Sequence, residues 1–225
     1  MPVPEVTERF TGSVNRLTLG ATKEDGGTRS ATVTIGGARN VVYGGSPADA
    51  GEKPVVAMDV LDSRPEDWPD ALLEPYKDVL DSPADWAKKC VDEFGAELIC
   101  VKFEGIHPDK KDLDASHSVK VTEEVAKAVG VPLILWGCGN DEKDNEVMPK
   151  VSGAAKGEKC LIGTVTEDNY KSLTAIALAD GHYLITHAPL DINIAKQVNI
   201  LTSDMGFPLE RIVTLQATGA LGYAI

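Results

Sequence analysis

Polar side chains that could take part in chemistry follow six apolar segments of this sequence, at the points where buried strands would end. The set consists of Asp59, Asp62, Glu104, His107, Asn140, Asp141, Thr164, Thr166, His187, Asp191, Asn193, Gln216 and Thr218. In folds built from parallel strands and helices, working residues lie just beyond the carboxyl ends of the strands. The pattern therefore predicts a polar rim, rich in amides and hydroxyls, that could hydrogen-bond a large flat ligand or a partner's backbone.

Two kinds of chemistry are conceivable at this rim. His107, His187, Glu104 and Asp191 could converge from neighbouring strands on a metal ion, and Glu104 with Asp191 could form an acid–base pair. A structural role accounts for the same residues more simply, because Asp191 and Asn193 can cap the following helix and His187 can bond to backbone. No Ser-His-Asp or Cys-His order indicates a nucleophile, so the structural interpretation is favoured.

The cysteines are scattered along the chain, at Cys90, Cys100, Cys138 and Cys160. No two of them form a C-x-x-C pair, and their spacings fit neither a zinc site nor a ferredoxin-type cluster. Cys100 and Cys160 lie within or beside apolar strand segments, so we expect buried thiols at both positions. We also expect this chain alone to bind no metal ion and no iron–sulfur cluster.

Composition limits the partners that the chain can have. With 225 residues there is enough chain for a large core, and the net charge of −13 argues against nucleic-acid or anionic-membrane surfaces, which need basic patches. No apolar run is long enough to span a bilayer, and no basic region followed by an apolar stretch marks a secretion signal. We expect a cytoplasmic protein with no nucleic-acid or membrane partner.

Residues 1–53 predict an N-terminal extension. The segments 13–19 and 30–35 alternate polar and apolar residues, and Asp25-Gly26-Gly27 between them supplies turn residues. This pattern indicates a two-stranded β-hairpin. Because an isolated hairpin is only marginally stable in water, we expect it to pack on the main domain.

Strand and helix patterns alternate through the second predicted unit, residues 54–225. One predicted helix has Ser82 as its N-cap, and another spans residues 122–129. Six strands are predicted, centred near Val56, Leu98, Leu133, Leu161, Leu184 and Val213. A glycine follows each of five helical segments, with spacings of 35, 27, 24 and 25 residues, at Gly95, Gly130, Gly157, Gly181 and Gly206. Such glycines are typical of left-handed caps at helix ends. The regular repeat indicates parallel strands joined by right-handed crossovers.

Two architectures fit this repeat: an open doubly wound sheet and a TIM-type (β/α)8 barrel. The sequence has neither a G-x-G-x-x-G pattern after its first strand nor a phosphate-binding P-loop pattern, so the barrel is favoured. A closed barrel needs eight strands, and six are found. We therefore expect a barrel truncated after strand six. The natural protein should continue past Ile225 by two βα units, about 50 to 70 residues, unless another segment fills the gap.

Five stretches of the sequence are distinctive. They are GATKEDGGTR at 20–29, IGG at 35–37, FEG at 103–105, HAPLDINIAKQ at 187–197 and TGALGY at 218–223. In these stretches the chain resembles the small, or delta, subunit of the corrinoid iron–sulfur protein of the acetyl-CoA synthase/decarbonylase system. The resemblance runs over nearly the whole chain, and the hairpin stretch and the 187–197 stretch are the more specific ones.

The resemblance implies a TIM-type barrel in a heterodimer with a larger subunit, which carries a corrinoid and a 4Fe–4S cluster. Such a complex takes a methyl group from a methyl-tetrahydropterin methyltransferase and passes it on cobalt to acetyl-CoA synthase, with CO dehydrogenase in the same system. This subunit would be non-catalytic, and would support and shield the corrinoid. The residues expected to face the corrinoid are His187, Asp191, Asn193, Asn140, Gln216 and Thr218. The isolated chain should bind no cobamide tightly.

Two enzymatic alternatives remain open on the sequence alone. A pterin-binding barrel that itself transfers the methyl group of methyl-tetrahydrofolate would also use Asp and Asn at strand ends, and Asp59, Asn140 and Asp191 could take that part. An aldolase-like barrel would need a Schiff-base lysine on a strand, and the candidate is Lys102, placed early within its strand. Binding of methyl-tetrahydrofolate would separate the pterin enzyme from the non-catalytic subunit.

Overall fold

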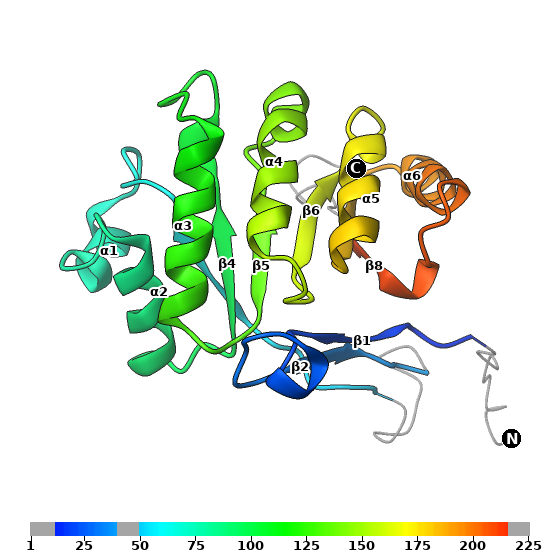
Figure 1. Cartoon of the computed structure of the whole chain (residues 1–225), viewed down its shortest axis with the longest axis horizontal. Coiled ribbons are helices and arrows are strands. Elements are labelled where there is room, and N and C mark those ends of the chain that lie inside the picture. The colour runs from blue at the N-terminus through cyan, green and yellow to red at the C-terminus, as the bar shows by residue number, and fades with distance from the viewer. Residues whose placement is uncertain (1–11, 40–49, 216–225) are drawn as a thin grey trace, which may run out of the picture.

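The structure is a computed structural model, and it describes residues 12–39 and 50–215 (Figure 1). Its strands are β1 Arg16–Leu19, β2 Val33–Gly36, β3 Ala57–Leu61, β4 Leu98–Lys102, β5 Leu133–Trp136, β6 Leu161–Val165, β7 Tyr183–His187 and β8 Ile212–Leu215. Its α-helices are α1 Asp70–Leu73, α2 Pro83–Asp92, α3 Ala115–Ala128, α4 Asp141–Ala154, α5 Tyr170–Asp180 and α6 Ile192–Asp204. Short 3-10 turns include Glu104–Ile106, just after β4, and Leu209–Arg211, just before β8.

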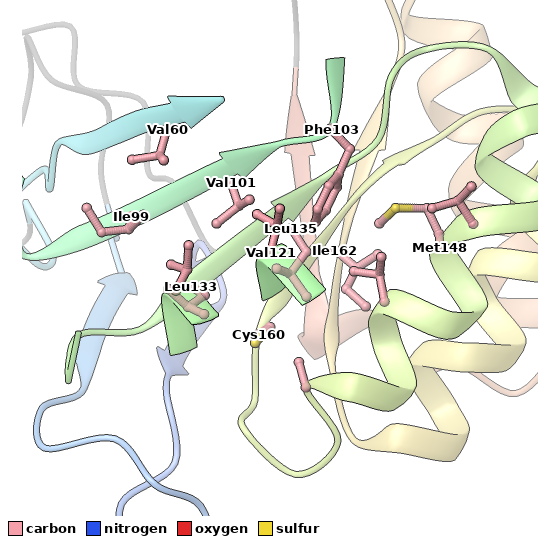
Figure 2. Packing of buried hydrophobic residues seen from close by; sticks show 14 of the residues in the cluster. Val60, Ile99, Val101, Phe103, Val121, Leu133, Leu135, Met148, Cys160 and Ile162 are labelled. Atoms are coloured by element: carbon pink, nitrogen blue, oxygen red, sulfur yellow. The ribbon is translucent and has the colours of Figure 1, made fainter. Parts of the chain in front are cut away.

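Six of these strands form one parallel sheet in the order β3-β4-β5-β6-β7-β8, which is also their order in the chain. One face of the sheet packs against the helices. Figure 2 shows Ile99, Val101, Leu135 and Ile162 of this face among buried neighbours, including Met148 of α4. Alternate residues along a strand point to opposite faces, so each buried strand supplies a second row of side chains.

The second row lies on the face away from the helices, which we call the inner face. It carries Leu98, Cys100, Ile134, Leu161 and Ile185, all buried. Residues of β1 and β2 complete this second cluster, and no residue of α1 to α6 belongs to it among the described parts of the chain. All the packed helices therefore cover one face. A doubly wound sheet would have helices on both faces, so that alternative is wrong.

Single-sided helices with strands in sequential order are the arrangement found in barrels. In the described residues, β3 and β8 each pair with one neighbouring strand and form the two edges of the sheet. An α/β fold with a six-stranded parallel sheet is thus confirmed. Closure into an eight-stranded barrel stays a prediction.

The N-terminal extension forms the predicted antiparallel pair, with β1 and β2 aligned from Arg16↔Gly36 to Leu19↔Val33. It lies across the amino ends of the sheet strands, below the helices in Figure 1. The amide N–H of Gly20 donates to the carbonyl of Lys159 just before β6 (3.1 Å), and that of Ser30 donates to the carbonyl of Gly130 before β5 (2.9 Å). The hairpin therefore covers the amino end of the sheet and leaves the carboxyl end accessible.

Arg29 fixes the hairpin to the end of α3 and the segment before β6. Its guanidinium pairs with Glu158 at 2.8 Å, and the two side chains are 2% and 10% exposed. The same guanidinium donates to the carbonyls of Val129 (2.8 Å) and Ala126 (2.6 Å) at the end of α3. A buried ion pair is tolerated when hydrogen bonds satisfy its remaining donors, as they do here.

Most predicted helix signals are confirmed, with two corrections. Ser82 caps α2 by accepting from the amide of Asp85, as its position indicates. Helix α3 starts at Ala115, seven residues before the predicted start at residue 122, because Asp114 caps it through the amide of His117 (3.0 Å). Gly95, Gly157, Gly181 and Gly206 have positive φ as expected, but Gly130 does not. There, Arg29 satisfies the helix-end carbonyls, and a Cβ on Gly130 would lie 2.0 Å from the Ser30 hydroxyl.

Candidate functional site

The accessible carboxyl end of the sheet holds an ion pair that crosses from β3 to β4. Asp59 and Lys102 continue the inner-face rows of these strands, and Lys102 Nζ lies 2.6 Å from Asp59 Oδ2. The ammonium also lies over the ring of Trp136, 5.8 Å from its centroid, since Lys102 and Trp136 are register partners of β4 and β5. The Lys102 and Asp59 side chains are 29% and 42% exposed, so both can be reached from solvent.

A cavity of about 210 Å³ opens beside this pair. Its lining is formed by Lys102, Glu104, His107, Lys110, Trp136, Gly137 and Cys138. Glu104 accepts a hydrogen bond from the Lys110 ammonium, so the second charged pair is also neutralised. The amide of Asp109 donates to Nδ1 of His107 (3.1 Å), which leaves the ring proton on Nε2. We call this cavity and Asp59 the mouth pocket.

The state of Lys102 bears on the aldolase alternative. Burial lowers the pKa of Lys102, but the hydrogen bond and negative charge of Asp59 outweigh burial and leave the pKa raised. A Schiff-base lysine needs a lowered pKa that frees its amine. Lys102 is moreover the last residue of β4 and not an early one, which corrects its predicted place. The aldolase interpretation therefore loses its nucleophile.

The loop between β5 and α4 is held by a buried carboxylate. Asp144 Oδ1 accepts from the amide of Cys138 at 2.8 Å, and Oδ2 accepts from the amide of Gly139 at 3.1 Å. Burial raises the pKa of Asp144, and the two backbone bonds act in the opposite direction. A Cβ on Gly137 would lie 2.5 Å from Asp144 Oδ2, so glycine at this position permits the close approach of the carboxylate.

Neighbouring loops of the same rim are tied together by a second carboxylate. Asp141 Oδ1 accepts from the hydroxyl of Thr166 and from the amide of Asn169, both at 2.8 Å. Asn169 also donates to the carbonyl of Thr164 at 3.0 Å. These bonds fix the loop after β6 against the start of α4, and they engage polar groups that the sequence placed at the rim.

Two of the residues predicted to face a corrinoid act as helix caps. The Asn140 side chain accepts from the amide of Lys143 (3.0 Å) and caps α4, and Asp191 accepts from the amide of Asn193 (2.7 Å) and caps α6. The capping alternative is thus confirmed for Asp191 and wrong for Asn193, which lies inside α6 and donates its backbone amide to the cap, whereas capping by Asn140 was not expected. Asn193 is exposed in the first turn of α6, and His187 ends β7, half-buried. Gln216 and Thr218 lie outside the described residues.

The loop after β7 has an unusual backbone. Leu190 has φ of 63°, in the left-handed region that disfavours a branched aliphatic residue. Leu190 is 58% exposed, and Ile192, two residues on, is 59% exposed. Two large apolar side chains therefore stand in solvent at the carboxyl end of the sheet, which we call the mouth, on one of the two more specific stretches of the sequence.

No group of three or more His, Cys, Asp or Glu side chains within residues 12–39 and 50–215 is placed to hold a metal ion. The conceivable set of Glu104, His107, His187 and Asp191 therefore does not converge there. Cys90, Cys100 and Cys160 are buried, and burial raises the pKa of every cysteine thiol, to about 12 for Cys138.

The mouth pocket was only partly visible in the sequence. Asp59, Glu104, His107 and Lys102 stood out as single residues at strand ends, but their pairing depends on strand register. The alternation of Leu98, Cys100 and Lys102 was the available signal, because it puts a charge on the same face as two apolar neighbours. Lys110 gave no signal, since it lies six residues beyond Glu104 in a polar loop.

Comparison with known proteins decides the family. A family model described as the CO dehydrogenase/acetyl-CoA synthase delta subunit matches residues 17–225. The chain belongs to this delta-subunit family. A relative named acetyl-CoA decarbonylase/synthase complex subunit delta, from Archaeoglobus fulgidus, is 40% identical over 97% of this chain and 48% of its own length.

Proteins with the same name from Methanopyrus kandleri and Methanocaldococcus jannaschii are 33% and 32% identical, over 95% and 99% of this chain and 53% and 56% of their own lengths. The delta-subunit chain thus spans about half the length of the curated relatives it matches. Among solved structures, an N-acetylneuraminate lyase from Fusobacterium nucleatum overlaps 63% of this chain and 50% of its own, with 13% identity and a TM-score of 0.42. None of the helices in the described ranges is long and apolar enough to cross a membrane.

Proposed function

We propose that this delta-family chain is a non-catalytic subunit whose carboxyl-end mouth docks on a partner subunit that carries a corrinoid. The corrinoid would supply the cobalt that carries a methyl group between a methyl-tetrahydropterin methyltransferase and acetyl-CoA synthase. Support comes from the family and from relatives that are named as subunits of an acetyl-CoA decarbonylase/synthase complex. The partner's 4Fe–4S cluster belongs to the same proposal.

The observation that carries the proposal is the loop of Leu190 and Ile192. A left-handed aliphatic residue costs roughly 1 to 2 kcal/mol, and an exposed leucine gives nothing back in the isolated chain. Strain of this kind is kept where the resulting geometry serves a function. Two exposed apolar side chains on this loop supply the buried contact that a docking partner needs at the centre of an interface.

The rest of the mouth suits a cover better than a ligand. Lys102 and Lys110 are paired with carboxylates, and Asn140 and Asp191 are used as caps. His107 Nδ1 accepts a backbone hydrogen bond. The mouth could therefore shield one face of a corrinoid without occupying its cobalt. We propose that His187 and Asn193 at the rim face the corrinoid or the domain that holds it.

The pterin-methyltransferase alternative is less well supported. It would need Asp59, Asn140 and Asp191 to bind a pterin, and these residues are respectively ion-paired, capping α4 and capping α6. A titration with methyl-tetrahydrofolate separates the two functions: micromolar binding favours the enzyme, and the absence of binding favours the docking subunit.

The proposal is tested by replacing Leu190 and Ile192 together with serine in the full-length protein. The variant is mixed with the corrinoid-carrying subunit, and the dissociation constant and the rate of methyl transfer to the corrinoid are measured. We expect affinity to fall by at least about tenfold, since two apolar side chains are removed from the interface.

Leu209→Ser is the matched control, because Leu209 is 53% exposed but lies before β8, at the opposite end of the sheet. It should leave affinity unchanged. Equal affinities for wild type and the double variant would overturn the proposal, as would an equal loss in the Leu209 control.

A further inference from the structure

The mouth pocket combines two ion pairs with an aromatic wall. Asp59 with Lys102 and Glu104 with Lys110 sum to zero charge. Two further titratable side chains line the cavity: Cys138, whose pKa burial raises to about 12, and His107, which has one ring nitrogen that accepts and one that carries a proton. This balance stands out in a chain of net charge −13. A ligand entering the cavity meets alternating donors and acceptors rather than a field of one sign.

This balance decides which ligand the pocket can take. A lone anion would have to lie beside Asp59 and Glu104, and a lone cation beside Lys102 and Lys110. In either case a like charge would be brought close in a partly desolvated site. A neutral group with both a donor and an acceptor meets no such penalty: lysine ammonium groups have three donors each, and carboxylates have several lone pairs.

Shape narrows the class further. A cavity of about 210 Å³ is smaller than the sites of drug-sized ligands, so it accommodates a side group rather than a whole large molecule. The ring of Trp136 provides a flat wall next to the two charged pairs. A primary carboxamide has all of these properties: it is planar, neutral and small, and it both donates and accepts hydrogen bonds.

We propose that the mouth pocket is a binding site for a primary carboxamide, with its carbonyl oxygen toward the Lys102 or Lys110 ammonium and its NH₂ toward Asp59 or Glu104. The carboxamide could belong to a corrin ring, whose edge carries such groups, or to an Asn or Gln side chain of a partner protein. In the corrin case the inference rests on the proposed function, and in the protein case it does not.

The first test uses three probes of equal size and different charge: propionamide, propionate and propylammonium. Each is titrated into the chain while the indole N–H signals of its three tryptophans are followed by NMR, with the Trp136 signal assigned from Trp136→Phe. Propionamide should shift the Trp136 signal with a dissociation constant at least about tenfold below those of the ions. Tighter binding of either ion, or no shift with propionamide, would overturn the proposal.

Single charge removals give a sharper test, because each should switch the preferred probe. Asp59→Asn leaves Lys102 unpaired, so propionate should become the best probe. Lys102→Gln leaves Asp59 unpaired, so propylammonium should become the best probe for that variant.

Asp112→Asn is the control, because Asp112 forms a 2.7 Å ion pair with Lys143 and neither residue lines the cavity. It changes the net charge as Asp59→Asn does, and should keep the preference for propionamide. If Asp59→Asn fails to fold, Glu104→Gln removes the other carboxylate of the mouth pocket with the same expectation. An unchanged preference in the folded charge variants would sink the idea.

A last comparison separates the two sources of the carboxamide. Dicyanocobinamide, which keeps the corrin amides, is compared with dicyanocobyrinic acid, in which they are carboxylic acids, and with an Asn- and Gln-containing peptide. A shift of the Trp136 signal by the amide corrin alone assigns the corrin source. A shift by propionamide and the peptide but not the corrin keeps the pocket and counts against the proposed function. A shift by the acid corrin alone would overturn the carboxamide assignment.

Discussion

The two ends of the six-stranded sheet use charged side chains in different ways. At the amino end, Arg29 and Glu158 are 2% and 10% exposed, and the guanidinium also binds carbonyls of α3 and its end. At the carboxyl end, Lys102 and Asp59 are 29% and 42% exposed, and Lys102 lines a cavity. The protein itself supplies hydrogen-bond partners for the Arg29–Glu158 pair, whereas the Lys102–Asp59 pair can still form hydrogen bonds with a ligand.

This difference separates structural from functional roles better than residue type does. Both ends hold an ion pair between distant parts of the chain, and both contribute buried or half-buried charge. A pair sealed under a hairpin stabilises the packing of that hairpin. A pair that solvent can reach adds little stability, so its placement beside a cavity has to be explained by what enters the cavity.

Replacing Arg29 with methionine should lower stability more than any other single substitution at either end of the sheet. Glu158 would be left as an unpaired buried carboxylate, and the carbonyls of Ala126 and Val129 would lose their donor. The expected loss in free energy of unfolding is about 3 to 5 kcal/mol, measured by urea denaturation.

Arg16→Met is the control, since the Arg16 side chain is 63% exposed in its pair with Glu52. It should cost no more than about 1 kcal/mol. Similar losses in the two variants would remove the distinction between sealed and accessible pairs.

Gly137→Ala should have the next largest effect, at the carboxyl end. The added Cβ would lie 2.5 Å from the Asp144 carboxylate, which must shift away from the amides of Cys138 and Gly139. Crowding of this kind costs about 1 to 3 kcal/mol.

Gly153→Ala makes the same substitution later in α4, where nothing lies within 4 Å of the added atom. It should be neutral or stabilising by up to about 1 kcal/mol. Thermal unfolding of the two variants side by side measures the difference. Equal stabilities would show that the 137–139 loop moves freely and that the Asp144 carboxylate does not hold it in place.

The elements of the fold could be predicted because their signals are local. Alternating apolar strands, the Ser82 cap and four positive-φ glycines are each contained in a few residues. The start of α3 was missed because the stretch after Asp114 is polar, although Asp114 is itself a capping residue. Gly130 was misassigned because its role depends on Ser30 and Arg29, a hundred residues earlier in the chain.

The location of the candidate site was predictable, but its working residues were not. Parallel strands place their carboxyl ends together, so the rim could be identified from the sequence. Whether Asn140 and Asp191 point at a ligand or cap their own helices is decided by the local backbone, and both cap. The contact of Asp59, Lys102 and Trp136 follows from the register of three strands, which no local pattern specifies.

A smaller effect is expected from His182, which belongs to the sealed amino end. Its Nδ1 accepts from the amide of Cys160, and its Nε2 donates to the carbonyl of Ser152, both at 3.2 Å. Burial lowers the pKa of His182 below its usual value of about 6.5. The folded protein therefore binds this proton less readily than the unfolded chain. The stability from His182 is complete above the unfolded pKa and is lost as pH falls toward the folded one.

The measurement is the free energy of unfolding between pH 7.5 and pH 5.5 for wild type and His182→Asn, which cannot titrate. The decrease on acidification should be smaller in the variant. A wild-type slope in His182→Asn would show that this buried ring does not couple folding to pH.

The smallest expected effect tests the strain at the mouth directly. Leu190→Gly should raise the free energy of unfolding, because glycine adopts a φ of 63° without the penalty of roughly 1 to 2 kcal/mol that a Cβ brings. The greater freedom of glycine in the unfolded chain opposes this gain by about 0.5 to 1 kcal/mol. The net gain should be between zero and about 1.5 kcal/mol. Leu209→Gly, at an equally exposed leucine outside the positive-φ positions, should lower stability instead. Since Leu190→Gly also removes an apolar rim contact, it should weaken binding of the partner subunit while stabilising the isolated chain. A variant that gains stability and loses affinity would mean that the strained leucine is kept for docking. One that gains stability and binds as well as wild type would place the interface elsewhere on the chain.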